Sequence, residues 1–272
     1  MKLRDLPRAF QRHRAPKRYP HTIATFTLPI DGAVDLAQWQ HPGEKPTHVD
    51  QDEVTVLRRF LSEGDAAIDI GAHTGDSTVP MALAAGRSGV VFALEPNPYV
   101  FEVLQTTARL NPDRTHIVPL MFAATPEDGE FEFCYSDDGF CNGGAHRWQD
   151  RWRHGHFSRL RVLGRNLDAY LRTHHAAERA RIRYVKVDTE GFDRQVVRSL
   201  APLIELTRPY IRAEFFKHLP ATERYGFFDD LHGAGYRVFR WTPSEYQGEE
   251  LSREDVVRWR HFDVFAVPRE RM

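Results

Sequence analysis

The run Ala-Ile-Asp-Ile-Gly-Ala-His-Thr-Gly-Asp at residues 67–76 most constrains how this chain can fold. An apolar, strand-like segment ends near Asp69, and Gly71 and Gly75 then bracket a tight turn before a helix-like segment from Ser77. Glycine has no side chain, so such a turn lets the backbone approach a ligand closely. The run predicts a strand, a turn and a helix, with a ligand beside the turn.

Acids around this turn indicate the charge of that ligand. A dinucleotide would place an anionic pyrophosphate here, usually over the spacing Gly-x-Gly-x-x-Gly. This turn is Gly-x-x-x-Gly, and Asp69 and Asp76 lie close to it. Two carboxylates repel a pyrophosphate and suit a ligand with positive charge. S-adenosylmethionine, which carries an ammonium and a sulfonium group, is the better electrostatic match. Asp69 either bonds the ligand's amino group or holds the turn by accepting backbone N–H bonds.

Composition argues against several other classes of protein. The 272 residues suffice for one large α/β domain, 41% of them are hydrophobic and the net charge is −1, which indicates neither disorder nor a nucleic-acid partner. The two cysteines form neither a disulfide framework nor a zinc motif. No apolar run approaches the roughly 18–20 residues of a membrane span, and the N-terminus lacks the apolar segment of a signal peptide. We expect a cytoplasmic protein without an integral membrane segment.

Strand and helix patterns alternate along most of the chain. Strands are expected at 22–30, 66–70, 90–94, 116–119, 184–187, 210–213, 236–241 and 262–267, and helices at 51–61, 77–85, 98–110, 194–199 and 221–234. Repeated βα units indicate a mostly parallel sheet with helices on both faces. Residues 31–50 are rich in Gly, Pro and His and are expected to form a loop.

Two segments stand outside this alternation, which gives the expected division of the chain. Residues 1–50 are interpreted as a basic arm with a short β extension, and 51–272 as the main domain with an insertion at about 131–163. The arm holds seven Lys and Arg against one acid between residues 2 and 18, which is typical of a solvated arm or of contact with an anionic partner. Asp138 and Asn142 lie in a glycine-rich part of the insertion, which either closes over a substrate or forms an exposed hairpin tip.

Three acids lie at the predicted carboxyl ends of strands: Asp69, Glu95 and Asp188. In open α/β sheets, ligands bind outside this edge. Glu95 lies 24 positions after Gly71, a distance at which an acid can bond both ribose hydroxyls of an adenosine ligand. Ala123 follows the third strand and either flanks an adenine ring or belongs to the core.

The second strong motif is Lys-Val-Asp-Thr-Glu-Gly-Phe-Asp at residues 186–193. Lys186 and Asp188 alternate on one face of a strand, and a buried lysine needs a partner such as Asp188. Methylation of an alcohol needs a base that takes the hydroxyl proton as the methyl group transfers. Asp188, Glu190, Lys186 and His73 are the candidates, although His73 is equally interpreted as an ordinary turn histidine. The acids could also hold a divalent cation or cap the next helix, and we do not favour the metal.

Four motifs in order, from about residue 51 to 241, resemble the FkbM-type family of S-adenosylmethionine-dependent methyltransferases. They are Asp-Ile-Gly-Ala-His-Thr-Gly-Asp, Leu-Glu-Pro-Asn-Pro, Val-Lys-Val-Asp-Thr-Glu-Gly-Phe-Asp and Arg-Ala-Glu-Phe. The resemblance implies a Rossmann-like, seven-stranded methyltransferase sheet that is mostly parallel, with the last strand antiparallel. It also implies O-methylation of a hydroxyl on a sugar, glycan or related natural product. By the family's pattern, Asp69, Gly71, Gly75 and Glu95 fall on donor-binding positions, and Asp188 and Glu190 beside the transferred methyl group.

The expected site residues form three groups. Donor contacts are expected from Asp69, Gly71, Ala72, His73, Gly75, Asp76, Glu95, Pro96, Asn97, Ala123 and Asp188, catalytic roles from Asp188, Glu190, His73 and Lys186, and substrate contacts from Asp138, Asn142, Glu190 and Glu214. The segment 148–161, rich in Trp, Arg and His, has no assignment from the family and is expected to set substrate choice or assembly. A non-catalytic S-adenosylmethionine-binding scaffold and a nicotinamide-dependent dehydrogenase are the alternatives. The acids after residue 186 argue against the first, and the missing Gly-x-Gly-x-x-Gly against the second.

Overall fold

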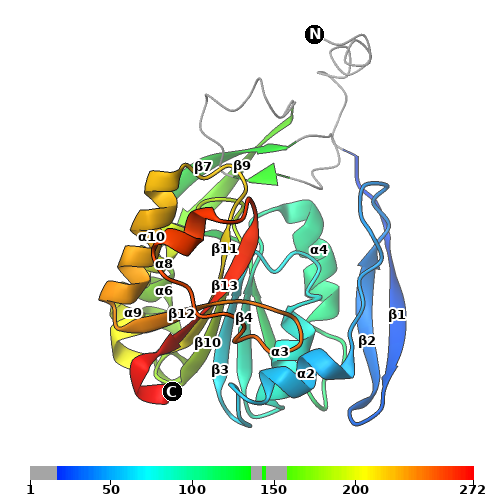
Figure 1. Ribbon diagram of the computed structural model, residues 1–272. Coiled ribbons are helices and arrows are strands. Elements are labelled where there is room, and N and C mark those ends of the chain that lie inside the picture. Colours follow the sequence, from blue (N-terminus) through cyan, green and yellow to red (C-terminus); the bar gives the residue numbers. More distant parts are fainter. Residues whose placement is uncertain (1–16, 136–142, 145–157) are drawn as a thin grey trace.

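The computed structural model describes residues 17–135, 143–144 and 158–272 (Figure 1). Its centre is a seven-stranded sheet with the strand order β12-β13-β11-β10-β3-β4-β5. The strands are β3 (Ala66–Ile70), β4 (Val90–Leu94), β5 (Ile117–Leu120), β10 (Ile182–Val187), β11 (Tyr210–Phe215), β12 (Tyr236–Arg240) and β13 (Phe262–Pro268). β13 pairs antiparallel with both neighbours, and the other pairings are parallel. The predicted fold class is confirmed, including the antiparallel last strand.

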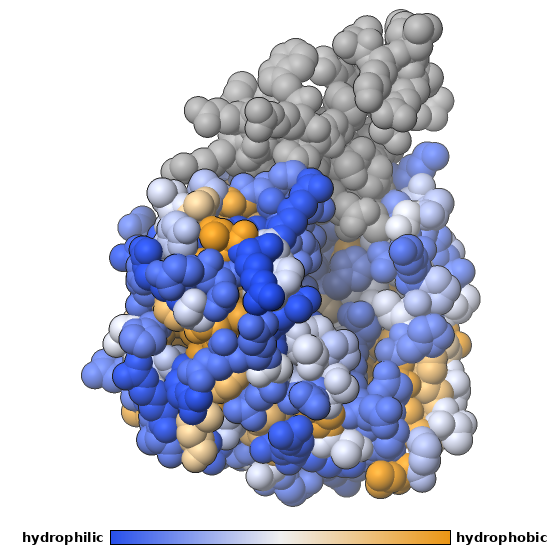
Figure 2. All heavy atoms as spheres, viewed as in Figure 1, coloured by the Kyte–Doolittle hydropathy of each residue, from blue (hydrophilic) through white to orange (hydrophobic). Residues whose placement is uncertain are grey.

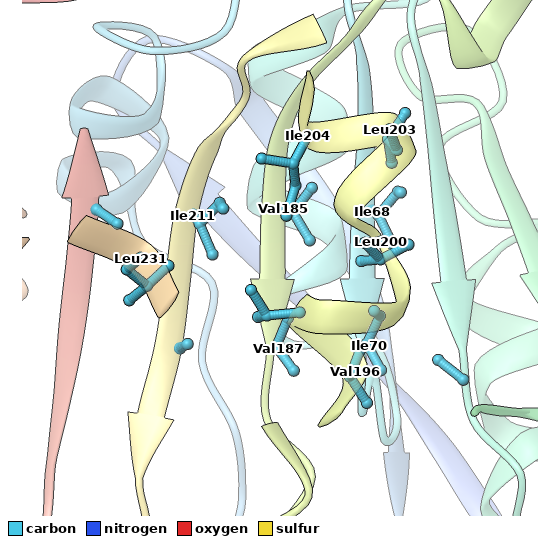
Figure 3. Close-up of a cluster of buried hydrophobic side chains, with 14 of the residues drawn as sticks. Ile68, Ile70, Val185, Val187, Val196, Leu200, Leu203, Ile204, Ile211 and Leu231 are labelled. Carbon is cyan, nitrogen blue, oxygen red and sulfur yellow. The ribbon is translucent and has the colours of Figure 1, made fainter. Parts of the chain in front are cut away.

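Helices cover both faces of this sheet (Figure 1). One face carries α2 (Gln51–Leu57), α3 (Thr78–Ala85) and α4 (Pro98–Thr107), and the other carries α6 (Leu167–His174), α8 (Asp193–Ser199), α9 (Ala201–Thr207) and α10 (Ala221–Gly233). Short helical turns form α7 (Ala176–Arg179), η3 (Glu254–Val257) and η4 (Arg269–Arg271). Because the strands are buried on both faces, they are nearly continuous apolar runs in the sequence. Figure 3 shows β3, β10 and β11 side chains packed against residues of α8, α9 and α10.

Two helices begin at a side-chain cap. The Asp50 side chain accepts a hydrogen bond from the backbone N–H of Glu53 at the start of α2, at 2.9 Å. The Asn97 side chain accepts one from the backbone N–H of Tyr99 at the start of α4, at 3.0 Å. Each cap satisfies a backbone donor that has no partner within its helix. Among the described helices, none is both long and apolar enough to cross a membrane.

The loop predicted for residues 31–50 is wrong in its first part. β1 (His21–Leu28) pairs antiparallel with β2 (Gly32–Trp39), so a hairpin occupies this region. Gly32 has a φ of 69° directly after the strand connection, a conformation that glycine adopts readily. Val34, Leu36 and Trp39 are buried, and the hairpin packs on α4. Figure 2 shows a face that is hydrophilic over most of its area, with hydrophobic residues along this hairpin at the right of the view.

A second, smaller sheet contains residues of the predicted insertion. It consists of β6 (Ala123–Ala124), β7 (Gly129–Tyr135), β8 (Gly143–Gly144) and β9 (Ser158–Arg165), in the order β6-β9-β7-β8. β7 and β9 pair antiparallel along their length, from Gly129 opposite Gly164 to Tyr135 opposite Ser158. The predicted substrate residues Asp138 and Asn142 lie outside the described residues, as do residues 1–16 and most of the segment 148–161.

Candidate functional site

A cavity of about 400 Å³ opens where β3, β4 and β10 end. Loops after these strands form one side of it, and aromatic side chains of β7 form another. Its lining includes the predicted residues Gly71, His73, Glu95, Pro96, Asn97, Ala123, Asp188 and Glu190, together with Phe122, Phe131, Phe133, Tyr135 and Phe192. Residues that are more than 100 positions apart in the sequence therefore meet at one cavity.

The turn after β3 needs its glycines. Gly71 has a φ of 80°, and a Cβ added there would lie 2.0 Å from the carbonyl oxygen of Asp188. Gly75 has a φ of 96°, and its added Cβ would lie 2.8 Å from a methyl group of Thr107. The backbone N–H groups of Gly71 and Ala72 donate to the carbonyl oxygen of Leu94, at 3.1 and 2.9 Å. The turn is thus held against β4, α4 and the segment after β10.

Asp69 is fully buried and is not among the residues that line the cavity. Its Oδ2 accepts hydrogen bonds from the hydroxyl groups of Ser77 and Thr78, at 2.8 and 2.7 Å. Its Oδ1 lies 3.3 Å from Nζ of Lys186. These contacts tie β3 to the start of α3 and to β10. Of the two interpretations of Asp69, they favour a residue that holds the turn, although its partners are hydroxyl groups and an ammonium rather than backbone N–H groups.

Lys186 is buried between two carboxylates. Its Nζ lies 3.3 Å from Asp69 and 3.4 Å from Asp188. Burial alone would lower the pKa of Lys186, but the two carboxylates outweigh it and raise that pKa above its ordinary value. A lysine that stays protonated cannot take a proton. The geometry therefore favours a role in which Lys186 holds the two acids.

Glu95 directly follows β4 and connects it to the glycine turn. Its Oε1 accepts a hydrogen bond from the backbone N–H of Asn97 at 2.8 Å, and its Oε2 accepts one from that of His73 at 3.2 Å. Burial raises the pKa of Glu95 above its ordinary value. Each carboxylate oxygen has further lone pairs, so Glu95 can also accept bonds from a ligand in the cavity.

His73 has a φ of 49° and lies between the hairpin and the cavity. Its Nε2 is 3.6 Å from a carboxylate oxygen of Glu44. Its ring meets the Trp39 ring edge-on, with 6.0 Å between the ring centres. The two neighbours come from β2 and the loop after it, so this predicted loop region helps to build the site.

A second cavity of about 560 Å³ shares Gly71, His73 and Asp188 with the first. Further lining residues are His48, Asp50, Asp52, Glu53, Asp76, Ser77, Lys186, Arg212, Trp241, Pro243, Ser244 and Tyr246. The Arg212 guanidinium donates to Asp263 at 2.9 and 2.8 Å, and it lies 3.6 Å from the centre of the Trp241 ring. Burial raises the pKa of Glu53 to about 7. Sequence reasoning missed Arg212 and Trp241, although an arginine within an apolar strand was a usable signal.

The segment after β10 is held by buried Asp193. Its carboxylate accepts hydrogen bonds from the Thr189 hydroxyl at 2.8 Å and from the backbone N–H groups of Gly191 and Glu214, at 3.3 and 3.2 Å. Glu190 in this segment has a φ of 55° and lines the first cavity. Burial and the Asp188 carboxylate raise the pKa of Glu190.

Glu214 is buried and is not among the residues that line either cavity. Its Oε1 is 3.0 Å from Nε2 of His261, a residue that sequence reasoning missed. Burial and then the charges of Asp188, Asp193, Glu190 and Asp263 raise the pKa of Glu214 to about 9. Within the described part of the chain, no three His, Cys, Asp or Glu side chains are grouped so that they could hold a metal ion.

A family model described as the methyltransferase FkbM domain matches residues 69–238. A search of curated proteins found no match. Among solved structures, the chain is similar to methyltransferase FkbM from Methylobacillus flagellatus KT, with 16% identity, a TM-score of 0.43 and 76% of this chain covered. The match spans 44% of that protein's chain.

Two further solved structures are similar over most of this chain. Fibrillarin from Aeropyrum pernix, in complex with S-adenosyl-L-methionine, is 12% identical with a TM-score of 0.44, and the match covers 93% of this chain and 97% of that one. An S-adenosylmethionine-dependent O-methyltransferase from Thermotoga maritima is 13% identical with a TM-score of 0.42, and the match covers 92% and 78%.

Proposed function

Because the family model matches more than half of the chain, the protein belongs to the FkbM methyltransferase family, and from this premise we propose that it methylates a hydroxyl group of a sugar, glycan or related natural product. The observation that carries the proposal is the meeting of the glycine turn, Glu95 and the segment 188–190 around one cavity. S-adenosylmethionine would supply an electrophilic methyl group, and the residues present suit it. The backbone at Gly71 allows a close approach of its cationic part. The Glu95 carboxylate suits its ribose hydroxyls, and the aromatic side chains that line the cavity suit its adenine ring.

We place the adenosine part in the first cavity. Glu95 would accept bonds from the ribose hydroxyls, and Pro96, Asn97, Phe122 and Ala123 would lie around the adenine ring, since all five residues line this cavity. The amino-acid part would follow the turn at Gly71 and His73, where the two cavities meet. Asp76 and the acids at the start of α2 line the second cavity and would favour its ammonium group.

Glu190 is the base that this geometry favours. A carboxylate whose pKa is raised by burial and by Asp188 takes a proton more readily than an ordinary one. In this proposal Asp188, whose carboxylate is held by Lys186, orients the acceptor hydroxyl. The hydroxyl oxygen would gain the methyl group as the bond from that methyl to the donor sulfur breaks, which would leave S-adenosylhomocysteine, and the hydroxyl proton would pass to Glu190. The protein thus contributes orientation and a proton acceptor.

Substitution of three acids tests this assignment. Glu95→Gln should weaken binding of S-adenosylmethionine by about tenfold or more, because one charged acceptor of hydroxyl bonds is lost. Glu190→Gln should lower kcat by about 10²-fold or more and leave the donor affinity nearly unchanged. Calorimetry gives the affinities, and Glu178→Gln on α7, which has no buried residue, is the control. Unchanged donor affinity in Glu95→Gln refutes the ribose site, and unchanged turnover in Glu190→Gln refutes the base.

We further propose that residues 51–272 form the methyltransferase domain and that the hairpin within residues 1–50 is an extension which packs on α4. The contacts between Glu44 and His73 and between Trp39 and His73 support a role for this extension in closing the donor site. A cytoplasmic location stays a prediction.

A further inference from the structure

Basic side chains lie around Phe216, which packs on the segment after β10. Phe216, just after β11, packs against Gly191, where an added Cβ would lie 3.1 Å from the Phe216 ring. Lys217 Nζ lies 5.4 Å from the centre of this ring, and the centres of the His218 and His261 rings lie 5.3 and 6.4 Å from it. We call Lys217, His218 and His261 the basic rim. Since Gly191 follows Glu190 directly, the rim lies next to the proposed proton acceptor.

Two members of the rim, Lys217 and His261, lie close enough to Glu190 for their charges to act on it. Burial and the Asp188 carboxylate raise the pKa of Glu190, and the positive charges of Lys217 and His261 act in the opposite direction. Lys217 is exposed, and among the described residues no carboxylate lies within ion-pair distance of it. The rim residues are not among those that line the first cavity, so this cation is available to a ligand that extends past Glu190.

His261 is held by a buried acid. Its Nε2 lies 3.0 Å from Oε1 of Glu214, while the His261 side chain is half exposed and Glu214 is buried. The other carboxylate oxygen of Glu214 has no hydrogen-bond partner among the described residues. The groups that face Glu214 are His261 and the acids Asp188, Asp193, Glu190 and Asp263. Glu214 therefore contacts one exposed ring, the His261 imidazole, and fixes the direction of that ring.

Buried Arg224 holds the backbone next to Lys217 and the backbone next to His261. Arg224 on α10 donates to the carbonyl oxygens of Phe216, Val256 and Trp259, at 2.9, 3.0 and 2.7 Å, and also to that of Arg260. Phe216 directly precedes Lys217 in the chain, and Arg260 directly precedes His261. The rim is thus mounted on a hydrogen-bonded base and is better ordered than three separate surface side chains would be.

We propose that the basic rim binds an anionic group on the acceptor, a carboxylate, phosphate or sulfate carried by a sugar, while the hydroxyl to be methylated lies at Glu190. This inference rests on the methyltransferase function proposed above. The interior beside Asp188 and Glu190 repels an anion, whereas the ammonium of Lys217 would donate a charge-assisted hydrogen bond to one and the imidazole of His261 a second hydrogen bond. The acidic and basic ends of the site would orient the acceptor in a single direction.

Binding of small sugars to the full-length chain loaded with S-adenosylhomocysteine tests this inference. The probes are glucose, glucuronic acid, glucose 6-phosphate and glucose 6-sulfate, measured by ligand-observed NMR at low salt. We expect at least one charged probe to bind about tenfold more tightly than glucose, and the preferred probe identifies the anion. Added salt should reduce this preference, because the rim is solvent-accessible.

Variants assign the preference to the rim. Lys217→Gln with His261→Gln should bring the charged probes to within about twofold of glucose, while Arg172→Gln, at an exposed position of α6, should leave the preference intact. If the double variant does not fold, Lys217→Gln alone is the test, because it disturbs no buried carboxylate. This single variant should lose about half of the preference on a logarithmic scale. Equal binding of charged and neutral probes, or a preference that survives in these variants, overturns the inference. Calorimetry with S-adenosylhomocysteine separates the two proposals: loss of donor binding refutes the proposed function, whereas donor binding without charge preference refutes only the rim.

Discussion

Replacement of Gly71 by alanine should damage the protein far more than the size of a methyl group suggests. The added Cβ would lie 2.0 Å from the carbonyl oxygen of Asp188, whereas real Cβ atoms essentially never come within 3.0 Å of another atom. The segment after β10 must therefore move by about 1 Å. An L-residue at a φ of 80° adds about 1–2 kcal/mol of backbone strain. We expect Gly71→Ala to lower the free energy of unfolding by about 2–4 kcal/mol.

The same shift should impair the proposed donor site, since a displacement of about 1 Å can cost about 10²-fold in turnover. Gly233→Ala is the matched control: Gly233 ends α10, its φ is not positive, and an added Cβ meets no atom within 4 Å. This control should stabilise the chain by about 0.5–1 kcal/mol or leave it unchanged. Urea unfolding and calorimetry with S-adenosylmethionine measure both effects. A Gly71→Ala protein with wild-type stability and donor affinity would refute the close approach of the two segments.

Three further predictions concern buried charges. Lys186→Met should lower the free energy of unfolding by about 3–5 kcal/mol, because it leaves Asp69 buried without its cation; a loss below about 1 kcal/mol in urea unfolding would show that the hydroxyl bonds to Asp69 suffice. Stability should fall between about pH 4 and pH 9, since the folded state holds protons on Asp193 and Glu214, with pKa values of about 7 and 9, that unfolded carboxyl groups release near pH 4. Glu214→Gln should flatten the upper part of this fall in unfolding midpoints, and an unchanged slope contradicts the assignment. Arg224→Met should lower Tm much more than Arg253→Met, because Arg224 donates hydrogen bonds to buried carbonyl groups whereas Arg253 makes an exposed pair with Asp229. Equal Tm changes would contradict this role of Arg224.

The strand ends of this fold could be predicted because their signals are local. An apolar run marks each central strand, and a glycine, a proline or an acid marks its end, so the positions of Asp69, Glu95 and Asp188 followed from the sequence. What each acid contacts did not follow. Asp69 meets Lys186, which lies 117 positions away, and only the register between β3 and β10 brings the two together. An isolated sequence shows that an acid is near a strand end, but not which cation or hydroxyl group it faces.

The missed elements have physical reasons of the same kind. β2 has buried Val34, Leu36 and Trp39, but the Gly, Pro and His around this segment concealed its alternation, and the pair Asp31-Gly32 was a neglected turn signal. β7 and β9 were not identified because their pairing joins residues far apart in the chain, and propensity alone does not specify such pairs. The aromatic wall of the first cavity, which β7 provides, was therefore absent from the predicted site.

Charges across the sheet separate the acids that hold the fold from those available for chemistry. Lys186 lies in register with Asp69 on β3 and with Arg212 on β11, and Arg212 in turn pairs with Asp263 on β13. The two cations are neighbours in the middle of this row and an acid lies at each end, so each buried charge has one neighbour of opposite sign, which burial requires. Glu95 and Glu190 lie outside the row and face the first cavity, and among the described residues neither has a lysine or arginine within ion-pair distance. Loss of activity on substitution of Asp69 would therefore report a damaged turn, whereas loss on substitution of Glu95 or Glu190 at unchanged stability would report a lost contact with donor or acceptor.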